Sequence, residues 1–237
     1  IDQASAFATL FTGSNPCFHG ISGEKVYDFD NEKEVSILKD ADYLGNYTRE
    51  NYSPKKLYSS TIGDELKIAS KGRSDVYAIA PNPEAAILSA GHAANGAFWI
   101  DNLNGKWATT TYYKGIPWYV DRYNNGPESL SARLDQMVWT PSLPTDQYKA
   151  FPYLLDELPF RYTFSEKTIS CYPNLKTSPF VNKEITRLAT QFLSYGAFGS
   201  RSCPDMLSVT YYAGNYRGTM NKEYTREIQD TYYQLDK

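Results

Sequence analysis

The amino-acid sequence predicts an α/β fold in which a mixed, mostly parallel sheet is flanked by helices on both faces. Short apolar runs typical of buried strands alternate along the chain with segments whose apolar residues recur at the helical spacing. The 237 residues are 41% hydrophobic and 22% charged, a composition that excludes wholesale disorder. A chain of this length fits a single domain.

The clearest helix begins at Ser178-Pro179 and ends at Gly196. Serine is a good N-cap residue, and proline is favoured in the first helical turn. The apolar residues of this segment recur at intervals of three and four, which predicts one continuous apolar face. That face consists of Ile185, Leu188, Ala189, Phe192 and Leu193.

Four weaker helical patterns cover residues 4–11, 61–70, 116–123 and 221–237. The first is rich in alanine and stops at Thr12-Gly13, and the third has Pro117 in its first turn. The second and the fourth have apolar residues at helical spacing, which predicts one apolar side for each. These sides consist of Ile62, Leu66 and Ala69, and of Tyr224, Ile228, Tyr232 and Leu235.

The predicted strands are short. Residues 76–80 and 206–212 are apolar runs typical of buried strands. Residues 96–100 and 107–113 are rich in aromatic and β-branched residues, and the turn-forming residues 101–105 between them predict a β-hairpin.

Three other segments are less regular. Residues 24–64 are polar and tyrosine-rich, and we expect an excursion with short strands there. Residues 85–94 are small and apolar, which favours a tightly packed helix or turn. Residues 126–171 contain five prolines and are expected to form a loop-rich, cap-like insertion.

Charge and residue counts exclude several classes of protein. The net charge of −3 and the pI of about 5.5 argue against a nucleic-acid partner. No run of about 18 apolar residues exists, so no membrane span is predicted in this section of chain. Two histidines make a His-rich metal centre difficult to build.

The three cysteines, Cys17, Cys171 and Cys203, lack the CxxC spacing of a zinc ribbon. They are compatible with one disulfide and a free thiol, or with three small buried side chains.

Several motifs, in order along nearly the whole chain, resemble those of one protein family. Residues 12–21 (TGSNPCFHGI) match a TG-x-x-P-x-x-HGI stretch, and residues 86–94 (AILSAGHAA) with Ala97-Phe98-Trp99 match an AILxAGHxA…AYW segment. Residues 204–209 (PDMLSV) resemble the strand PDLLSV of the same family. Together they resemble type I phosphodiesterases and nucleotide pyrophosphatases of the alkaline phosphatase superfamily, above all the alkaline phosphatases of Bacteroidetes-type bacteria.

The resemblance implies an alkaline phosphatase-like core and hydrolysis of phosphate esters. In the family, two zinc ions activate a Thr or Ser nucleophile and polarise the phosphoryl oxygens. Because such enzymes are usually exported, the resemblance also implies a periplasmic or cell-surface location. Two ligand-bearing strands of the family fall outside residues 1–237, so we expect this chain to be an internal section of one longer domain.

The family positions that carry the chemistry hold other residues in this sequence. The nucleophile position corresponds to Gln3, whose carboxamide cannot serve as the nucleophile. The phosphate-binding Asn position corresponds to Glu24, which repels phosphate. The Lys-x-Arg pair of the phosphatase subgroup corresponds to Asn82 and Glu84, so that one cation has become an anion.

The metal-binding motif is replaced as well. The Asp and His of its Asp-x-x-x-His pattern correspond to Asn215 and Thr219, which are poor zinc ligands. His19 and His92 match loops that carry no zinc ligand in the family, and we expect hydrogen-bonded structural histidines. Lys71-Gly72-Arg73 lies eleven residues before the cationic pair's position and is expected to be a solvated turn. The sequence therefore predicts no intact catalytic residue, no metal site and no cofactor.

Three functions fit this set of replacements. The favoured one is a pseudoenzyme that keeps a phosphoesterase-like fold, lacks zinc-dependent activity and binds an unidentified small molecule or glycan. The second is a hydrolase acting on phosphate esters with a rebuilt site, in which Glu24, Glu84 and Asn215 converge on a different cation through oxygen ligands.

The third is an extracytoplasmic glycan- or peptide-binding protein, and aromatic density motivates it. Exposed coplanar rings would favour this function, whereas rings buried against the sheet would contradict it. The rings concerned are those of Trp99, Trp107, Tyr112, Tyr113, Trp118, Tyr119 and the pair Tyr211-Tyr212.

Overall fold

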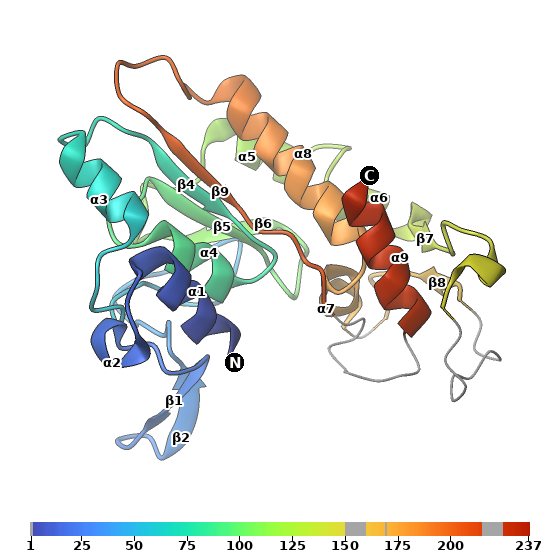
Figure 1. The fold of residues 1–237 in the computed structure, drawn as a ribbon, viewed down its shortest axis with the longest axis horizontal. Coiled ribbons are helices and arrows are strands. Elements are labelled where there is room, and N and C mark those ends of the chain that lie inside the picture. Colours follow the sequence, from blue (N-terminus) through green and yellow to red (C-terminus); the bar gives the residue numbers. More distant parts are fainter. Residues whose placement is uncertain (1, 150–159, 169, 215–224) are drawn as a thin grey trace.

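The computed structural model describes residues 2–149, 160–168, 170–214 and 225–237 (Figure 1). The described part contains a five-stranded sheet in the order β3-β6-β5-β4-β9. Its strands are β3 (Gly45–Asn46), β4 (Val76–Ile79), β5 (Gly96–Ile100), β6 (Trp107–Thr110) and β9 (Met206–Val209). Strand β4 pairs in parallel with β5 and β9, while β6 pairs antiparallel with β5 and β3. The predicted mixed sheet and its hairpin are confirmed.

Helices cover both faces of the sheet, as predicted. Helices α1 (Gln3–Thr12), α3 (Ile62–Ala69) and α4 (Pro83–Ala90) lie on one face, and α5 (Trp118–Asn125) and α8 (Phe180–Tyr195) lie on the other (Figure 1). The strand side chains alternate between two cores. In β5, Phe98 joins the core beneath α5 and α8, whereas Trp99 joins the core beneath α1 and α4.

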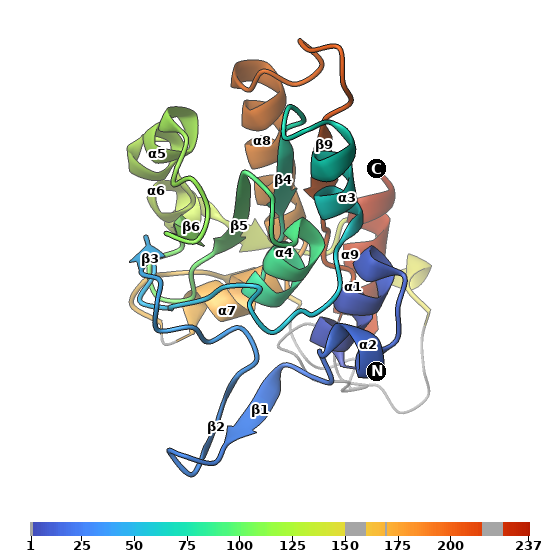
Figure 2. The same ribbon diagram turned by 90° about the vertical axis from the view of Figure 1, so that its left-hand side faces the viewer.

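The remaining elements are short, apart from α9. They are α2 (Pro16–His19), β1 (Lys25–Asp28), β2 (Lys33–Ser36), α6 (Leu130–Arg133), β7 (Val138–Trp139), β8 (Tyr162–Thr163), α7 (Cys171–Lys176), α9 (Thr225–Asp236) and two 3₁₀ turns, Leu134–Gln136 and Thr145–Gln147. Figure 2 shows the β1–β2 hairpin extending away from the sheet. Apolar side chains of residues 126–171, among them Trp139 and Phe160, belong to the core beneath α8. The action of this segment as a cap stays a prediction.

Small residues allow α1 to lie directly against α4. Ala4 and Ala8 of α1 and Ala85 of α4 are fully buried in one shared core. Asp2 caps α1, because its Oδ1 accepts a hydrogen bond from the amide of Ala4 at 2.9 Å. The first turns of the two helices are thereby held side by side.

Two glycines of the family-like motifs form turns that leave no room for a side chain. Gly20, in the HGI turn, has φ of +81°, and a Cβ there would lie 2.6 Å from a ring carbon of Tyr58. Gly91, in the AGH turn, has φ of +79°, and a Cβ there would collide with Thr61 Oγ1. Glycine adopts such angles without the steric cost of other residues. Both turns therefore depend on glycine for their geometry.

The predicted apolar side of helix 61–70 is confirmed at Leu66, which packs half-buried against the core, and is wrong at Ile62 and Ala69. Ile62 is 60% exposed and Ala69 is exposed, whereas Gly63, Asp64 and Lys67 are buried. Asp64 forms a capping box with Thr61 and also accepts a hydrogen bond from the amide of Ala93. Polar contacts of Asp64, together with the packing of Leu66, therefore orient α3.

The predicted apolar side of the last helix is wrong at Tyr232 and Leu235, while Ile228 is half-buried. Tyr232 is 55% exposed and Leu235 is 37% exposed, and Tyr224 lies outside the described residues. The buried side of α9 carries Glu227, Asp230 and Thr231 instead. Hydrogen-bonding partners on distant segments make this polar side the inner one.

Helix α8 and strand β9 match their predictions in part. Four of the five predicted apolar side chains of α8 are buried, but Leu193 is 62% exposed. Strand β9 is half-buried rather than buried, because it lies at an edge of the sheet in the described part of the chain.

The three cysteines form no disulfide: Cys17 is exposed, Cys171 is buried and Cys203 is half-buried. Lys71-Gly72-Arg73 is an exposed turn after α3, as predicted. Among the described residues, no helix has the length and apolar character needed to cross a membrane.

Candidate functional site

The predicted site positions gather where α1 and α4 begin. Gln3 is the first residue of α1 and is exposed, while Asn82 is the N-cap of α4 and Glu84 lies in its first turn. Glu24 immediately precedes β1 and is exposed. Asn215 and Thr219 lie outside the described residues. Their positions relative to the other four therefore remain a prediction.

Three carboxylates interact electrostatically at this place. Burial, and then the neighbouring charges of Glu24 and Asp2, raise the pKa of the Glu84 carboxyl. Burial and the charge of Asp2 likewise raise the pKa of Glu24. The structure thus brings Glu24 and Glu84 within electrostatic range of each other and adds Asp2, which the sequence did not single out.

One buried cation faces this carboxylate cluster. Lys176, at the end of α7, is only 5% exposed, and its Nζ donates hydrogen bonds to the Ile100 carbonyl at 3.2 Å and to Asn102 Oδ1 at 2.7 Å. Burial lowers the pKa of Lys176 to about 8, although the charges of Glu84 and Asp101 oppose this shift. The lysine is therefore already bound to protein oxygens.

The hydrogen-bond donors at the start of α4 are few. Asn82 caps the helix without a side-chain hydrogen bond. Pro83 occupies the first turn and has no amide hydrogen to donate. The helix dipole favours an anion at this end, and Glu84 already places a carboxylate in the first turn.

No metal site forms among these residues. In the described ranges, no group of three or more His, Cys, Asp or Glu side chains could hold a metal ion. The three-ligand cation site of the rebuilt-hydrolase hypothesis depends on Asn215, which lies outside those ranges.

His19 is a hydrogen-bonded structural residue, as predicted. Its Nδ1 accepts a hydrogen bond from the amide of Ile21 at 3.1 Å, and its Nε2 lies 3.0 Å from Thr9 Oγ1. Nδ1 therefore carries no hydrogen, and the ring is neutral. Burial accordingly lowers the pKa of His19.

His92 is also structural but has the opposite preference for protonation. Its Nδ1 lies 3.0 Å from Asp64 Oδ2, and its Nε2 lies 2.8 Å from the Leu57 carbonyl oxygen. Both partners accept hydrogen bonds, so both bonds form only when both ring nitrogens carry hydrogen. The hydrogen bond to Asp64 raises the pKa of His92 against the effect of burial.

Four of the eight aromatic side chains in the glycan-binding hypothesis are buried, and Tyr112 and Tyr212 are half-buried. Trp99, Trp107, Tyr113 and Tyr119 are at most 6% exposed. The exposed rings of that set are Trp118 at 58% and Tyr211 at 43%. The described residues of this set therefore form no continuous row of exposed coplanar rings. Only individual exposed rings of the set remain as candidates for contact with a glycan.

Sequence reasoning missed Asp2 and Lys176. The signal for Asp2 was present, because an aspartate directly before an alanine-rich helical segment is a good N-cap. Lys176 has no local signal, since its burial depends on tertiary contacts with residues 100–102.

The sheet and its flanking helices are similar to those of alkaline phosphatases, which belong to the alkaline phosphatase superfamily. The crystal structure of wild-type alkaline phosphatase PafA matches with a TM-score of 0.82 and 31% identity, over 99% of this chain and 48% of that chain. No model of a protein family matches the chain.

Two relatives are alkaline phosphatases by name. PafA of Elizabethkingia meningoseptica is 30% identical and PhoV of Synechococcus elongatus is 28% identical, each over 99% of this chain and 45% of the relative. The chain thus spans about half the length of these relatives.

A structure of a PafA variant matches equally well, with a TM-score of 0.82 and 30% identity over 99% of this chain and 48% of that chain. One Thr, one Asn, one Lys and one Arg are replaced in it. The replaced Thr and Asn are 21 residues apart in that protein, and the Lys and Arg are two residues apart.

Proposed function

We propose that this protein is a phosphoesterase-like pseudoenzyme, which lacks zinc-dependent phosphoesterase activity and acts by binding. The observation that carries the proposal is the carboxylate cluster of Asp2, Glu24 and Glu84 at the starts of α1, β1 and α4. Phosphate esters are anions at neutral pH, and the cluster repels them where the family has a hydroxyl, an amide and two cations.

Residue spacing supports the assignment of these positions. Gln3 and Glu24 are 21 residues apart and Asn82 and Glu84 are two apart. The replaced residues of the PafA variant show the same two spacings. In this chain the residues of both pairs lie at the starts of α1, β1 and α4, where the carboxylate cluster is found.

The test is metal analysis and turnover on the intact protein, with p-nitrophenyl phosphate and bis-p-nitrophenyl phosphate as substrates. PafA of Elizabethkingia meningoseptica serves as the positive control. We expect substoichiometric zinc and no turnover above the buffer rate. Stoichiometric zinc together with turnover would overturn the proposal.

The electrostatic argument predicts a gain of anion binding on charge reversal. The double substitution Asn82→Lys and Glu84→Arg removes one carboxylate and adds two cations beside Glu24. We expect phosphate affinity, measured by calorimetry, to rise at least about tenfold, which corresponds to about 1.4 kcal/mol. The control is Asn31→Lys/Glu34→Arg in the β1–β2 hairpin, which makes the same change in charge away from α4. Equal gains in both variants would contradict a local effect.

A rebuilt hydrolase site is the second candidate, because Glu24 and Glu84 do lie within electrostatic range of each other. The same turnover assay, repeated with Mg²⁺, Mn²⁺ and Ca²⁺, tests it. Turnover that needs one of these ions and is lost in Glu84→Gln would favour this candidate over the pseudoenzyme.

We further propose a periplasmic or cell-surface location, which the similarity to alkaline phosphatases PafA and PhoV supports. Fractionation of producing cells, with a cytoplasmic marker as control, tests it. Recovery of the intact protein with the cytoplasmic marker would contradict this location.

A further inference from the structure

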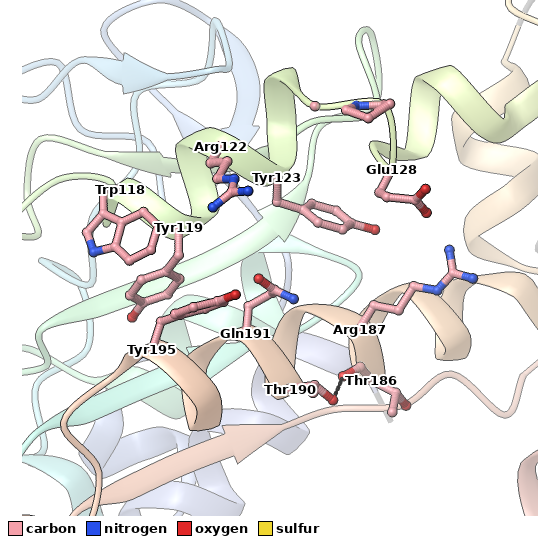
Figure 3. Close-up of a pocket in the computed structure, with 12 residues that line it drawn as sticks. Trp118, Tyr119, Arg122, Tyr123, Glu128, Thr186, Arg187, Thr190, Gln191 and Tyr195 are labelled. Atoms are coloured by element: carbon pink, nitrogen blue, oxygen red, sulfur yellow. Dashed lines mark hydrogen bonds between the residues drawn. The ribbon is translucent and has the colours of Figure 1, made fainter.

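A cleft of about 510 Å³ lies between α5 and α8, on the opposite face of the sheet from α1 and α4 (Figure 3). Its walls carry aromatic rings at one end and guanidinium groups from both helices. Its volume lies in the range of small-molecule sites in proteins. Of the predicted phosphoesterase positions that the structure describes, Gln3, Glu24, Asn82 and Glu84, none lines it.

Two rings provide exposed apolar surface. Trp118 is 58% exposed and Tyr195 is 51% exposed, and their centroids are 5.2 Å apart in an edge-on arrangement. Tyr119 lies behind them, stacked on Tyr195 at 6.2 Å and almost fully buried. The two exposed rings are therefore fixed by packing while part of their surface remains open to a ligand.

The charged groups of the cleft leave an excess of positive charge. Arg122 is exposed and forms no ion pair within the described part of the chain. Glu184, the partner of Arg187 at 3.5 Å, is bound more closely by Arg133 at 2.6 Å, so its charge is largely neutralised there. Glu128 contributes the one carboxylate among the lining residues.

The lining distinguishes among ligand classes. It contains no Leu, Ile, Val, Met or Phe, so an amphipathic peptide helix would find no aliphatic surface to pack against. Helices form both walls, and they offer no strand edge to an extended peptide. What remains are ring faces, guanidinium groups and the Gln191 carboxamide, which can contact the C–H faces, the acidic groups and the hydroxyls of a sugar.

We propose that the cleft between α5 and α8 binds an anionic oligosaccharide, in which sugar rings stack on Trp118 and Tyr195 and an acidic substituent pairs with Arg122 and Arg187. The site is separate from the carboxylate cluster, so the proposal stands whether or not phosphoesterase activity is absent. An anionic oligosaccharide would then be the class of ligand that this protein binds.

Tryptophan fluorescence of the intact protein provides the test. Trp99, Trp107 and Trp139 are at most 2% exposed, so the exposed Trp118 is the indole of this chain that a ligand in the cleft can contact. The probe is trigalacturonate, and its fully methyl-esterified form is the neutral control of the same shape. We expect a saturable change with the acid, and at least about tenfold weaker binding of the ester.

Variants locate the binding. Trp118→Ala and Arg122→Gln should each weaken trigalacturonate binding about tenfold in calorimetry, and Arg122→Gln should also reduce its salt dependence. Trp118→Phe should abolish the fluorescence change while keeping most of the affinity. The control variants Phe29→Ala and Arg49→Gln alter an exposed ring and an exposed arginine outside the cleft. They should change neither the affinity for trigalacturonate nor the fluorescence response.

Three results would overturn the proposal. The first is equal affinity for the ester and the acid, and the second is unchanged affinity in folded Trp118→Ala and Arg122→Gln. The third is binding of hexaglutamate or AMP as tightly as trigalacturonate, which would replace the sugar by an acidic peptide or a nucleotide. Circular dichroism of each variant confirms that it is folded.

Discussion

At the scale of single residues, the two histidines illustrate how hydrogen-bond partners decide protonation. His19 accepts an amide hydrogen and is neutral, while His92 lies between two acceptors and is favoured as the cation. Their pKa values move in opposite directions from the ordinary value of about 6.5. The contribution of His19 to stability is therefore full above about pH 6.5 and that of His92 is full below it, so their sum is largest near that pH.

The raised pKa of His92 predicts a loss of stability above neutral pH. Its contribution is full below the unfolded-state pKa of about 6.5 and is lost as pH rises through the higher folded-state pKa. We expect the free energy of unfolding, measured in urea, to fall by about 1 kcal/mol or less over this window, because the side chain is one-third exposed. His92→Gln should lack this step. An unchanged pH profile in His92→Gln would show that Asp64 does not stabilise the cation.

At the scale of elements, two helices bury polar side chains on their inner sides. Asp230 of α9 is fully buried and accepts hydrogen bonds from Trp139 Nε1 at 2.6 Å, the Ser142 amide at 2.8 Å and the Tyr148 hydroxyl at 2.8 Å. Burial opposes its ionisation, but these bonds lower the pKa of Asp230 overall. The carboxylate thereby attaches α9 to the segment 126–171.

Asp230→Asn should destabilise the protein strongly. The amide keeps one acceptor oxygen and presents an NH₂ group to donors, so we expect a loss of about 3 kcal/mol in urea unfolding at pH 7. Because the pKa of Asp230 is lowered, its contribution is present above an unfolded-state pKa of about 3.9 and is lost as pH falls through the folded-state pKa. Asp236→Asn, at an exposed position of the same helix, is the control. Similar losses in both variants would contradict the role of the buried bonds.

Periodicity predicted those elements whose burial is apolar. It located α8 and the central strands because their inward residues are hydrophobic. It misassigned the sides of α3 and α9 in part, because the buried Asp64 and Asp230 are satisfied by partners 29 and up to 91 residues away in the chain. The positions Gln3, Glu24, Asn82 and Glu84 came from motif spacing, whereas Lys176 could be found only in the folded chain.

At the scale of the whole molecule, the sheet separates two regions with different chemistry. The α1–α4 side carries the carboxylate cluster, and the α5–α8 side carries the aromatic and arginine-lined cleft. Close packing of alanines sets the position of α1 against α4 and therefore the arrangement of Asp2 and Glu84. The geometry of the first region depends on this small-residue contact.

Overpacking this contact should be costly. Ala8 is fully buried and faces α4, whereas Ala6 is exposed on the same helix. We expect Ala8→Val to lower the free energy of unfolding by about 1–3 kcal/mol through displacement of α1. Ala6→Val should lose only the helix-propensity difference of about 0.5 kcal/mol. Equal losses would show that α1 can move away from α4 without penalty.

The glycines at the HGI and AGH turns have a consequence for how such chains are recognised. Gly20 and Gly91 are required by backbone angle and lack of space, and neither requirement involves a reacting phosphate. Motifs centred on these turns report that a chain can fold in this way. A search that weights them would group a chain with hydrolases whether or not it keeps the residues of the chemistry. Functional classification here should therefore be based on the starts of α1 and α4 and not on the turns that make the family recognisable.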